Sequence, residues 1–415
     1  MLSLFEIAAL LLVLTAIFAW ANQAVFRLPL TIGLLLMGLV ASGLLLLVEL
    51  YAPGVEVAAA VEETIAGIDV FDLVMNGMLA FLLFAGAMHV DLSELASVKW
   101  VIALMATLGV CISTAIVGFG SWWIAGALGL DLPLAWALVF GALISPTDPV
   151  AVLSLLKTVV VPEALEAKIA GESLFNDGVG VVVFTVVLAI AAGSGEEPVD
   201  ALHIAELFFV EAGGGALLGL VAGFVAYKMM KVIDQHTVEV LITLALVTGT
   251  YALAQALHLS GPIAVVIAGL LIGNRASLER FSENTTQHLF DFWDLVDGML
   301  NAVLFLLIGL EVVVLTFDPS FMGLAIAAVP LVLFARLCAV SIPLLALSLR
   351  RTFPPGSIPV LTWGGVRGGI SVALALSLPD VEAKPLILLA TYAVVIFSVV
   401  VQGLTVTRVV ERFVR

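Results

Sequence analysis

The chain has 415 residues, of which 62% are hydrophobic and only 12% are charged. A soluble globular domain is typically about 25% charged and about 45 to 50% apolar, so this composition excludes an ordinary water-soluble protein. The net charge is −16 at pH 7 and the basic residues form no patch, which argues against nucleic acid as a partner. The sequence therefore predicts an all-α polytopic membrane protein whose surroundings are membrane lipids.

Thirteen apolar segments are long enough to be transmembrane helices, although the ninth is short and interrupted by Gly and Pro. Twelve spans is therefore the alternative count. The segments lie at about 4–20, 29–50, 70–89, 98–127, 133–156, 164–192, 203–230, 237–257, 260–274, 289–317, 320–349, 358–378 and 385–407.

The basic residues predict the orientation of these helices. Of the 16 Lys and Arg residues, ten fall in loops after odd-numbered helices and three in the C-terminal tail. Loops after even-numbered helices contain only Lys384, and the remaining two basic residues, Arg336 and Arg367, lie within apolar segments. Because positive charge accumulates on the cytoplasmic side, we expect the N-terminus outside and the C-terminus in the cytoplasm.

The odd number of spans permits a repeat inside a single transmembrane domain at 1–415. We divide it into a first repeat at 1–192, a linking helix at 203–230 and a second repeat at 236–411. The two six-helix repeats then begin on opposite sides of the membrane, which is the inverted-repeat plan of secondary transporters.

That plan predicts one interrupted helix in each repeat, meeting near the middle of the membrane. Helix 5 contains Ser145-Pro-Thr-Asp-Pro149, in which two prolines remove amide donors and favour unwinding. Helix 12 contains Gly364-Gly-Val-Arg-Gly-Gly369, which is equally poor as continuous helix. The sequence therefore predicts broken crossing helices 5 and 12, with Arg367 as the charge at the crossing.

Helix 6 contains acidic and polar residues on two neighbouring faces. Ser173 and Asp177 are four residues apart and share one face, while Glu172 and Asn176 share another about 100° away. A carboxyl group in the middle of a spanning helix normally faces protein or water and marks an ion or proton path. We expect Asp177 to be the central residue of such a path.

The first face can form an oxygen site with helix 5. Asp177, Asp148, the Ser173 hydroxyl and the Thr147 carbonyl provide the oxygen ligands that hard cations prefer. Burial favours the protonated form of a carboxyl group, so protons should compete with the cation for Asp177. One site open alternately to each side would then couple opposite fluxes.

The second face has a different role, because a buried guanidinium requires a partner. We expect Arg336 in helix 11 to pair with Glu172 as a structural brace between helices 6 and 11. Alternatives remain for the other charges. Asp177 could instead only pair with Arg367, Asp148 could cap a helix, and Arg367 could balance Asp148 or the charge of a helix end.

Five motifs in this order resemble those of the monovalent cation/proton antiporter superfamily, in its Na⁺/H⁺ exchanger branch with the NhaP-like proteins of bacteria and archaea. They are Ser145-Pro-Thr-Asp-Pro-Val-Ala-Val152, Gly171-Glu-Ser-Leu-Phe-Asn-Asp177, Phe334-Ala-Arg336, Gly364-Gly-Val-Arg-Gly-Gly369 and Val401-Gln-Gly-Leu-Thr405. The resemblance covers nearly the whole chain.

The resemblance implies a transporter of the cell inner membrane rather than an enzyme, with Na⁺ or Li⁺ exchanged for H⁺ at 1:1 and no further cofactor. It implies a homodimer in which a core part moves in an elevator-like way against a dimerisation part. The implied Na⁺ ligands are Asp177, Asp148, Ser173 and Thr147. The Asn176-Asp177 pair is similar to that of electroneutral members, and the implied brace is Glu172 with Arg336.

One position departs from the family pattern and keeps a second cation open. NhaP-like proteins often have an acidic residue in helix 3, where this chain has Ala85. K⁺/H⁺ exchange at the same site is therefore an alternative function. From another class, two intramembrane aspartates could form an aspartyl protease, but the chain lacks the Gly-x-Gly-Asp pattern expected there.

Overall fold

The computed structural model describes residues 4–51, 70–148, 163–193, 201–278, 283–315, 318–348 and 353–413. Within these ranges the regular structure is entirely helical. Ten helices there are long and apolar enough to cross a membrane, and two shorter apolar helices accompany them. The chain is thus an all-helical integral membrane protein, as its composition predicted.

The helices of the first half begin and end as follows. They are α1 (Leu4–Ala21), η1 (Asn22–Phe26), α2 (Leu30–Tyr51), α4 (Val70–Asp72), η2 (Leu73–Met78), α5 (Leu79–Met88), α6 (Leu92–Leu104), η3 (Met105–Gly109), α7 (Val110–Ala127), α8 (Leu134–Leu143) and α10 (Glu163–Ala191). The part of predicted helix 5 from Pro149 onward lies outside the described residues.

The second half continues in the same way. Its helices are α11 (Ala201–Met230), α12 (His236–Ala256), α13 (Gly261–Leu278), α14 (Glu283–Glu311), η4 (Val312–Val314), η5 (Pro319–Phe321), α15 (Met322–Ser348), α16 (Ser357–Trp363), α17 (Gly369–Leu376), α18 (Lys384–Phe397), η6 (Ser398–Gln402) and α19 (Gly403–Phe413).

Some boundaries differ from the hydropathy prediction because capping, rather than burial in lipid, sets a helix end. The fourth predicted span, expected at 98–127, begins at Leu92. There the Asp91 side chain accepts hydrogen bonds from the amides of Ser93 and Glu94, at 2.6 and 3.3 Å. Its hydrogen bonds with Ser93, first through the hydroxyl, hold the pKa of Asp91 below its ordinary value.

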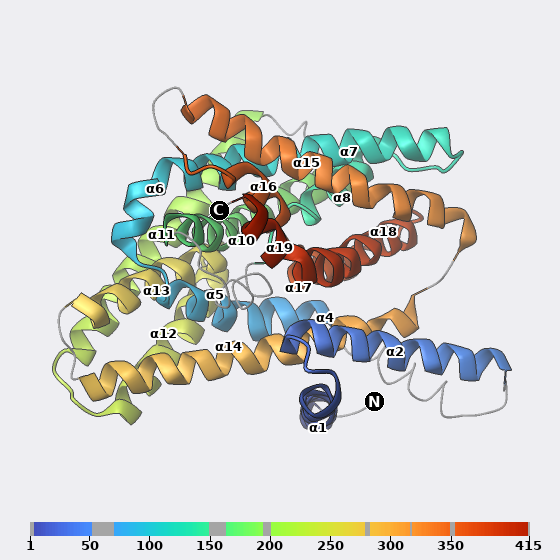
Figure 1. The fold of residues 1–415 in the computed structure, drawn as a ribbon. Helices are drawn as coiled ribbons and strands as arrows, with labels where there is room; N and C mark the ends of the chain where they lie inside the picture. The colour runs from blue at the N-terminus through green and yellow to red at the C-terminus, as the bar shows by residue number, and fades with distance from the viewer. Residues whose placement is uncertain are drawn as a thin grey trace.

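The helices form two packed groups (Figure 1). The crossing bundle consists of α6, α7, α8, α10 and α15 to α19, and the flanking bundle consists of α1, α2, α4, α5 and α11 to α14. Helix α1 is seen end-on in Figure 1 while α2 and α14 lie in the plane of the picture, so α1 crosses both steeply. Each bundle thus combines helices from both halves of the sequence.

The flanking bundle is held together by a buried tryptophan. Trp293 of α14 packs against Phe84 of α5, with ring centroids 4.7 Å apart, and its indole N–H donates to Thr243 of α12 at 3.1 Å. A buried indole needs both apolar packing and a partner for its N–H, and this position provides both. Three helices are therefore fixed at one point.

The crossing bundle contacts the flanking bundle through α10 and α17. At Gly178 of α10 a Cβ atom would lie 2.9 Å from Ile263 of α13, and at Gly369 of α17 one would lie 2.5 Å from Leu304 of α14. Such close approach requires glycine on at least one partner. Helix α10, which contains four of the predicted site residues, and α17, which follows Arg367, thus lie where the bundles meet.

The outer faces of the crossing bundle are apolar. On α15, Ile326 and Phe334 are exposed, whereas Ala335 and Arg336 of the same helix are buried. A monomeric soluble protein rarely exposes such faces, but lipid is a favourable environment for them. The helix therefore turns its aromatic and aliphatic side chains to the bilayer and its arginine inward.

Candidate functional site

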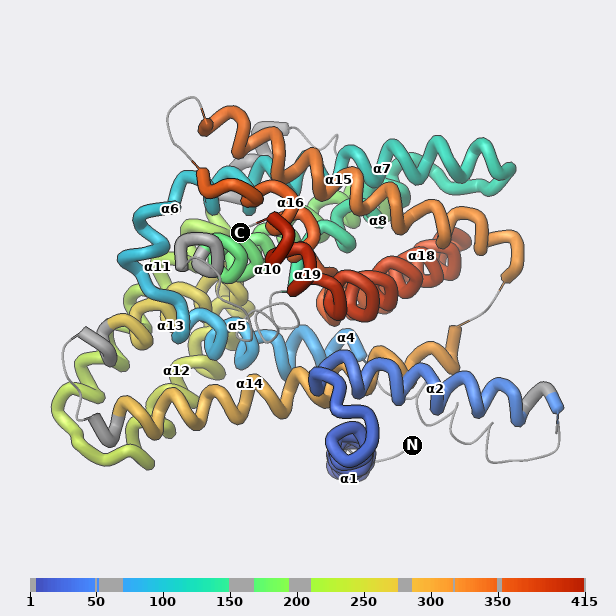
Figure 2. Tube along the Cα trace, in the orientation of Figure 1, coloured from blue at the N-terminus to red at the C-terminus, as the bar shows by residue number. Residues whose placement is uncertain are grey.

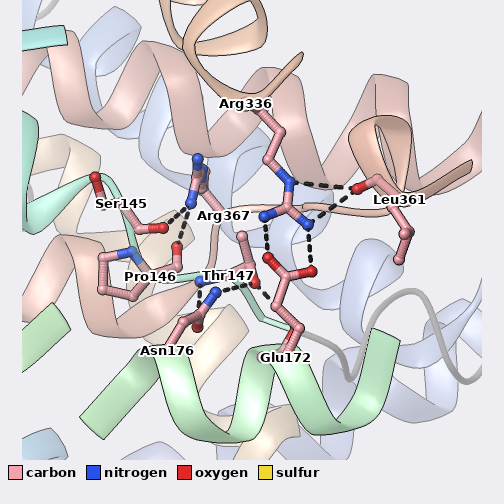
Figure 3. Close-up of polar contacts among 9 residues, drawn as sticks. Ser145, Pro146, Thr147, Glu172, Asn176, Arg336, Leu361 and Arg367 are labelled. Atoms are coloured by element: carbon pink, nitrogen blue, oxygen red, sulfur yellow. Dashed lines mark hydrogen bonds and ion pairs between the residues drawn. The ribbon is translucent and has the colours of Figure 1, made fainter. Parts of the chain in front are cut away.

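The chain leaves helical geometry directly after α8, at the first predicted interruption. Residues 145–148 are non-helical, and Pro146 has no amide proton to continue the helix. The carbonyl oxygens of Ser145 and Pro146 accept hydrogen bonds from Nη1 of Arg367, the second at 2.8 Å (Figure 3). A cationic side chain from the other half of the sequence thus binds the free carbonyl groups of the segment that directly follows α8.

The second interruption separates α16 from α17. Residues 365–368 are non-helical, and the carbonyl oxygen of Val366 accepts a hydrogen bond from the amide of Asp148 at 2.8 Å. A Cβ atom at Gly368 would collide with the Asp148 carboxyl group, so only glycine fits there. The two interrupted segments are therefore in direct contact where they cross. Figure 2 shows the trace of α16, the helix that ends directly before the second of them.

Helix α10 supplies the polar groups that surround the first interruption. The Ser173 hydroxyl lies 2.9 Å from the Thr147 hydroxyl. Asn176 uses both ends of its amide, since its Oδ1 accepts from the Thr147 amide at 3.2 Å and its Nδ2 donates to the Thr147 hydroxyl at 2.7 Å (Figure 3). Asn176 thereby fixes the backbone and the side chain of Thr147 together.

Asp177 lies one residue beyond this group on α10. The residue is only 5% exposed, and its Oδ1 has no hydrogen-bond partner among the described residues. The carboxyl group interacts electrostatically with Asp148, unfavourably, and with Arg367, favourably. A buried polar oxygen without a partner is costly, which makes it a candidate ligand for a cation or a carrier of a proton.

Glu172 and Arg336 form a bidentate ion pair. Nη1 of Arg336 contacts Oε1 of Glu172, and Nη2 lies 2.8 Å from Oε2. Nε and Nη2 also donate to the carbonyl oxygen of Leu361 in α16, at 3.3 and 3.0 Å (Figure 3). The guanidinium therefore joins three helices. The sequence predicted a link between only two of them, because a backbone carbonyl acceptor cannot be recognised from residue types.

The structure thus places the predicted site residues in two neighbouring groups. Thr147, Ser173 and Asn176 are joined by hydrogen bonds, and Asp148 and Asp177 are close enough to interact electrostatically. Arg367 donates to two carbonyl oxygens of the segment that follows α8, and it also interacts electrostatically with Asp177.

The sequence interpretation assigned no role to two polar residues next to this site. Ser398 and Gln402 are four residues apart; Ser398 accepts a hydrogen bond from the amide of Arg367 in the second interruption, and Gln402 donates one to the carbonyl of Trp363 at the end of α16. Their four-residue spacing, with Gln402 inside the Val401-Gln-Gly-Leu-Thr405 motif, was the available signal.

Comparisons with known proteins agree with this arrangement. The profile of the family described as sodium/hydrogen exchanger, transmembrane, matches residues 11–412. The chain belongs to the sodium/hydrogen exchanger family. It is similar to the Na⁺/H⁺ antiporter NhaP of Pseudomonas aeruginosa, with 46% identity over 98% of this chain and 96% of the relative. It is also similar to the Na⁺/H⁺ antiporter NhaH of Halobacillus aidingensis, with 35% identity over 98% and 97% of the two chains.

A solved structure shares the exchanger fold. The sodium proton antiporter MjNhaP1 of Methanocaldococcus jannaschii has a TM-score of 0.74 and 20% sequence identity, covering 98% of this chain and 97% of its own. The predicted resemblance to sodium/hydrogen exchangers is therefore confirmed. Members of this family are secondary transporters and not enzymes, so the aspartyl protease alternative is withdrawn.

Proposed function

We propose that this exchanger moves Na⁺ or Li⁺ in one direction and H⁺ in the other, with both ions competing for Asp177. The observation that carries the proposal is the buried Asp177 carboxyl group, whose Oδ1 has no partner among the described residues, beside two crossing interrupted segments. The names of the bacterial relatives support Na⁺ as the cation.

The cation is bound in this proposal by Asp177, Asp148, Ser173 and Thr147. The Ser173 hydroxyl, which lies 2.9 Å from that of Thr147, and the Thr147 carbonyl oxygen can each direct a lone pair toward one cation, and the two carboxyl groups supply the charge. Asn176 contributes by holding Thr147 in place. The Asp148 carboxyl group is kept next to the crossing by its backbone hydrogen bond to Val366.

Competition at one carboxyl group accounts for a 1:1 exchange. Asp177 is neutralised either by a proton or by a monovalent cation, so the loaded site carries the same charge in both directions. Asn176, the neighbouring polar position, is neutral and adds no second exchangeable proton. Alternating exposure of the site to the two sides of the membrane then couples the fluxes without net charge movement.

The proposal includes the finer architecture. We propose thirteen membrane crossings in two inverted repeats, with the N-terminus outside and the C-terminus cytoplasmic, in a bacterial or archaeal inner membrane. The matched interruptions at 145–148 and 365–368, which touch each other, support the repeat, and the distribution of basic residues supports the orientation. We also propose a homodimer in which the crossing bundle moves against the flanking bundle.

The test is exchange by purified protein in liposomes that contain a pH-sensitive dye. Addition of Na⁺ or Li⁺ should move protons, and Asp177→Asn should reduce this signal to that of empty liposomes while leaving the unfolding temperature in detergent unchanged. Asp380→Asn, a substitution at an exposed carboxylate bonded to Lys384, serves as the control and should exchange normally. Normal transport by Asp177→Asn would contradict the proposal.

K⁺/H⁺ exchange is kept as a second candidate because of Ala85. This residue is buried in α5, whose next residue, Gly86, lies against Leu174 of α10. A side chain at position 85 that could supply a carboxylate oxygen is thus replaced by a methyl group. The same liposome assay with K⁺ decides between the cations, because a K⁺ signal larger than the Na⁺ signal would favour the second candidate.

A further inference from the structure

The last transmembrane helix contains a π-helical turn next to the site. Helix α18 ends at Phe397, the π-helical turn η6 runs from Ser398 to Gln402, and α19 follows without a break. Single π-helical turns inside α-helices occur frequently at functional sites, because the wider turn redirects side chains. Ser398 and Gln402, at its two ends, are only 1% and 2% exposed.

Gln402 contacts the start of the interruption between α16 and α17. Its Nε2 donates to the carbonyl oxygen of Trp363 at 3.0 Å. That carbonyl is one of the last four of α16, which have no acceptor role inside their own helix. The indole N–H of Trp363 in turn donates to the Thr405 hydroxyl at 2.9 Å, so the end of α16 is attached twice to the last helix.

Ser398 contacts the other end of the same interruption. Its hydroxyl oxygen accepts the Arg367 amide hydrogen at 3.0 Å, while its own proton is donated to Oε1 of Gln402. The two side chains therefore form one chain of hydrogen bonds from the Trp363 carbonyl to the Arg367 amide. Because both are buried, either group left unsatisfied would be costly.

The position of this segment affects the site in the other half of the protein. The Arg367 guanidinium binds the Ser145 and Pro146 carbonyl oxygens, and the neighbouring Val366 carbonyl accepts the Asp148 amide. A shift of the backbone at 366–367 would thus move the segment that contains Thr147 and Asp148. The hydrogen bonds of Gln402 hold the chain on both sides of this backbone, directly to Trp363 and through Ser398 to Arg367.

We infer that Gln402 is a positioning residue of the exchange site, acting with Ser398 through the interrupted segment between α16 and α17. The inference rests on the proposed function, because it assumes that the cation binds at the crossing of the interrupted segments. It goes further by assigning a role in cation affinity to two residues that touch neither the cation nor Asp177. It also assigns a structural role to Gln402 of the Val401-Gln-Gly-Leu-Thr405 motif.

The test compares variants in the liposome assay described above. Gln402→Ala and Ser398→Ala should each raise the apparent KM for Na⁺ by about tenfold while the maximal rate changes by less than about twofold, the pattern expected when positioning of a binding site is lost. The apparent KM of the double variant should be no higher than about that of the more severe single variant, since the two side chains belong to one chain of hydrogen bonds. Thr391→Val is the matched control, because among the described residues the buried Thr391 hydroxyl on α18 bonds only the Ile387 carbonyl of its own helix.

Gln402→Glu distinguishes positioning from general stability. The carboxylate keeps the acceptor for Ser398 but cannot donate to Trp363, whereas the protonated acid can. Exchange by this variant, relative to the unchanged protein, should therefore increase as the pH falls. Unchanged KM values in both alanine variants, with only a lower unfolding temperature, would overturn the inference. Because Asp177→Asn is measured in parallel, retained exchange in that variant identifies failure of the proposed function itself.

Discussion

The guanidinium group of Arg336 binds the Glu172 carboxylate of α10 and the Leu361 carbonyl oxygen of α16 at the same time. Both side chains are buried, at 7% exposure for Arg336 and 2% for Glu172. This pair links the helix that contains Asp177 to α16, the helix that precedes the second interruption. Glu172 is therefore held in an ion pair, which supports the proposal that Asp177 is the exchanged carboxyl group.

Removal of one partner should destabilise the protein strongly. Arg336→Ala leaves the buried Glu172 carboxylate without its cation, which typically costs about 3 to 5 kcal/mol of unfolding free energy. Thermal and denaturant unfolding in detergent measure the loss. The double variant Glu172→Leu with Arg336→Met should recover at least about half of it, because no unpaired charge then remains. Equal stability of Arg336→Ala and the unchanged protein would exclude the brace.

Gly368 should not tolerate even one additional carbon atom. In Gly368→Ala the new Cβ would occupy the position of the Asp148 carboxyl group and displace it from the crossing. A shift of about 1 Å in a binding constellation can reduce rates by about 100-fold, so exchange should fall by that order.

Gly298→Ala is the matched control for this substitution. It lies on an exposed face of α14, and a Cβ atom there would meet nothing within 4 Å. Exchange should be normal and stability slightly higher, by about 0.5 to 1 kcal/mol, because alanine favours helix. Equal rates for the two alanine variants would show that Asp148 does not need its present position.

Asn176 should be required for the conformation of Thr147. In Asn176→Ala the buried amide and hydroxyl groups of Thr147 lose a partner, which typically costs about 1 to 3 kcal/mol. We expect lower stability together with a raised apparent KM for Na⁺. Thr185→Val on the same helix should leave KM unchanged, because within the described part of the chain the Thr185 hydroxyl bonds only the Val181 carbonyl. A normal KM in Asn176→Ala would remove Thr147 from the proposed ligand set.

The sequence predicted those features that depend on residue type and spacing. Hydropathy located the membrane helices, and the prolines and glycines located both interruptions, since proline removes an amide donor and glycine weakens helix. The contacts to backbone carbonyls could not be predicted in this way. Every carbonyl looks alike in a sequence, so the bonds from Arg367 to Ser145, from Arg336 to Leu361 and from Gln402 to Trp363 required the fold.

The spacing of Ser173 and Asp177 shows the same limit. The four-residue interval correctly placed Ser173 at the interrupted segment, where its hydroxyl lies 2.9 Å from that of Thr147. It gave no indication that Asn176, on the neighbouring face, would contact the same threonine. An extended segment crossing a helix can reach two faces at once, which helical periodicity alone does not reveal.

Competition between the two ions at Asp177 predicts a particular pH dependence. As the pH falls, a larger share of the carboxyl groups carries a proton and is closed to the cation. The apparent KM for Na⁺ should therefore rise, approaching about tenfold per pH unit where the protonated form dominates, since binding then requires displacement of one proton. Initial rates of exchange measured over a series of Na⁺ concentrations at each pH give this value.

The same measurement separates one shared site from two. For competition at Asp177, saturating Na⁺ should restore most of the rate at moderately acidic pH, and Li⁺ should give a parallel dependence because it uses the same oxygens. If the proton instead bound at a separate group, the maximal rate would decrease as the pH falls, while the apparent KM for Na⁺ stayed constant. That second pattern would contradict exchange through a single carboxyl group.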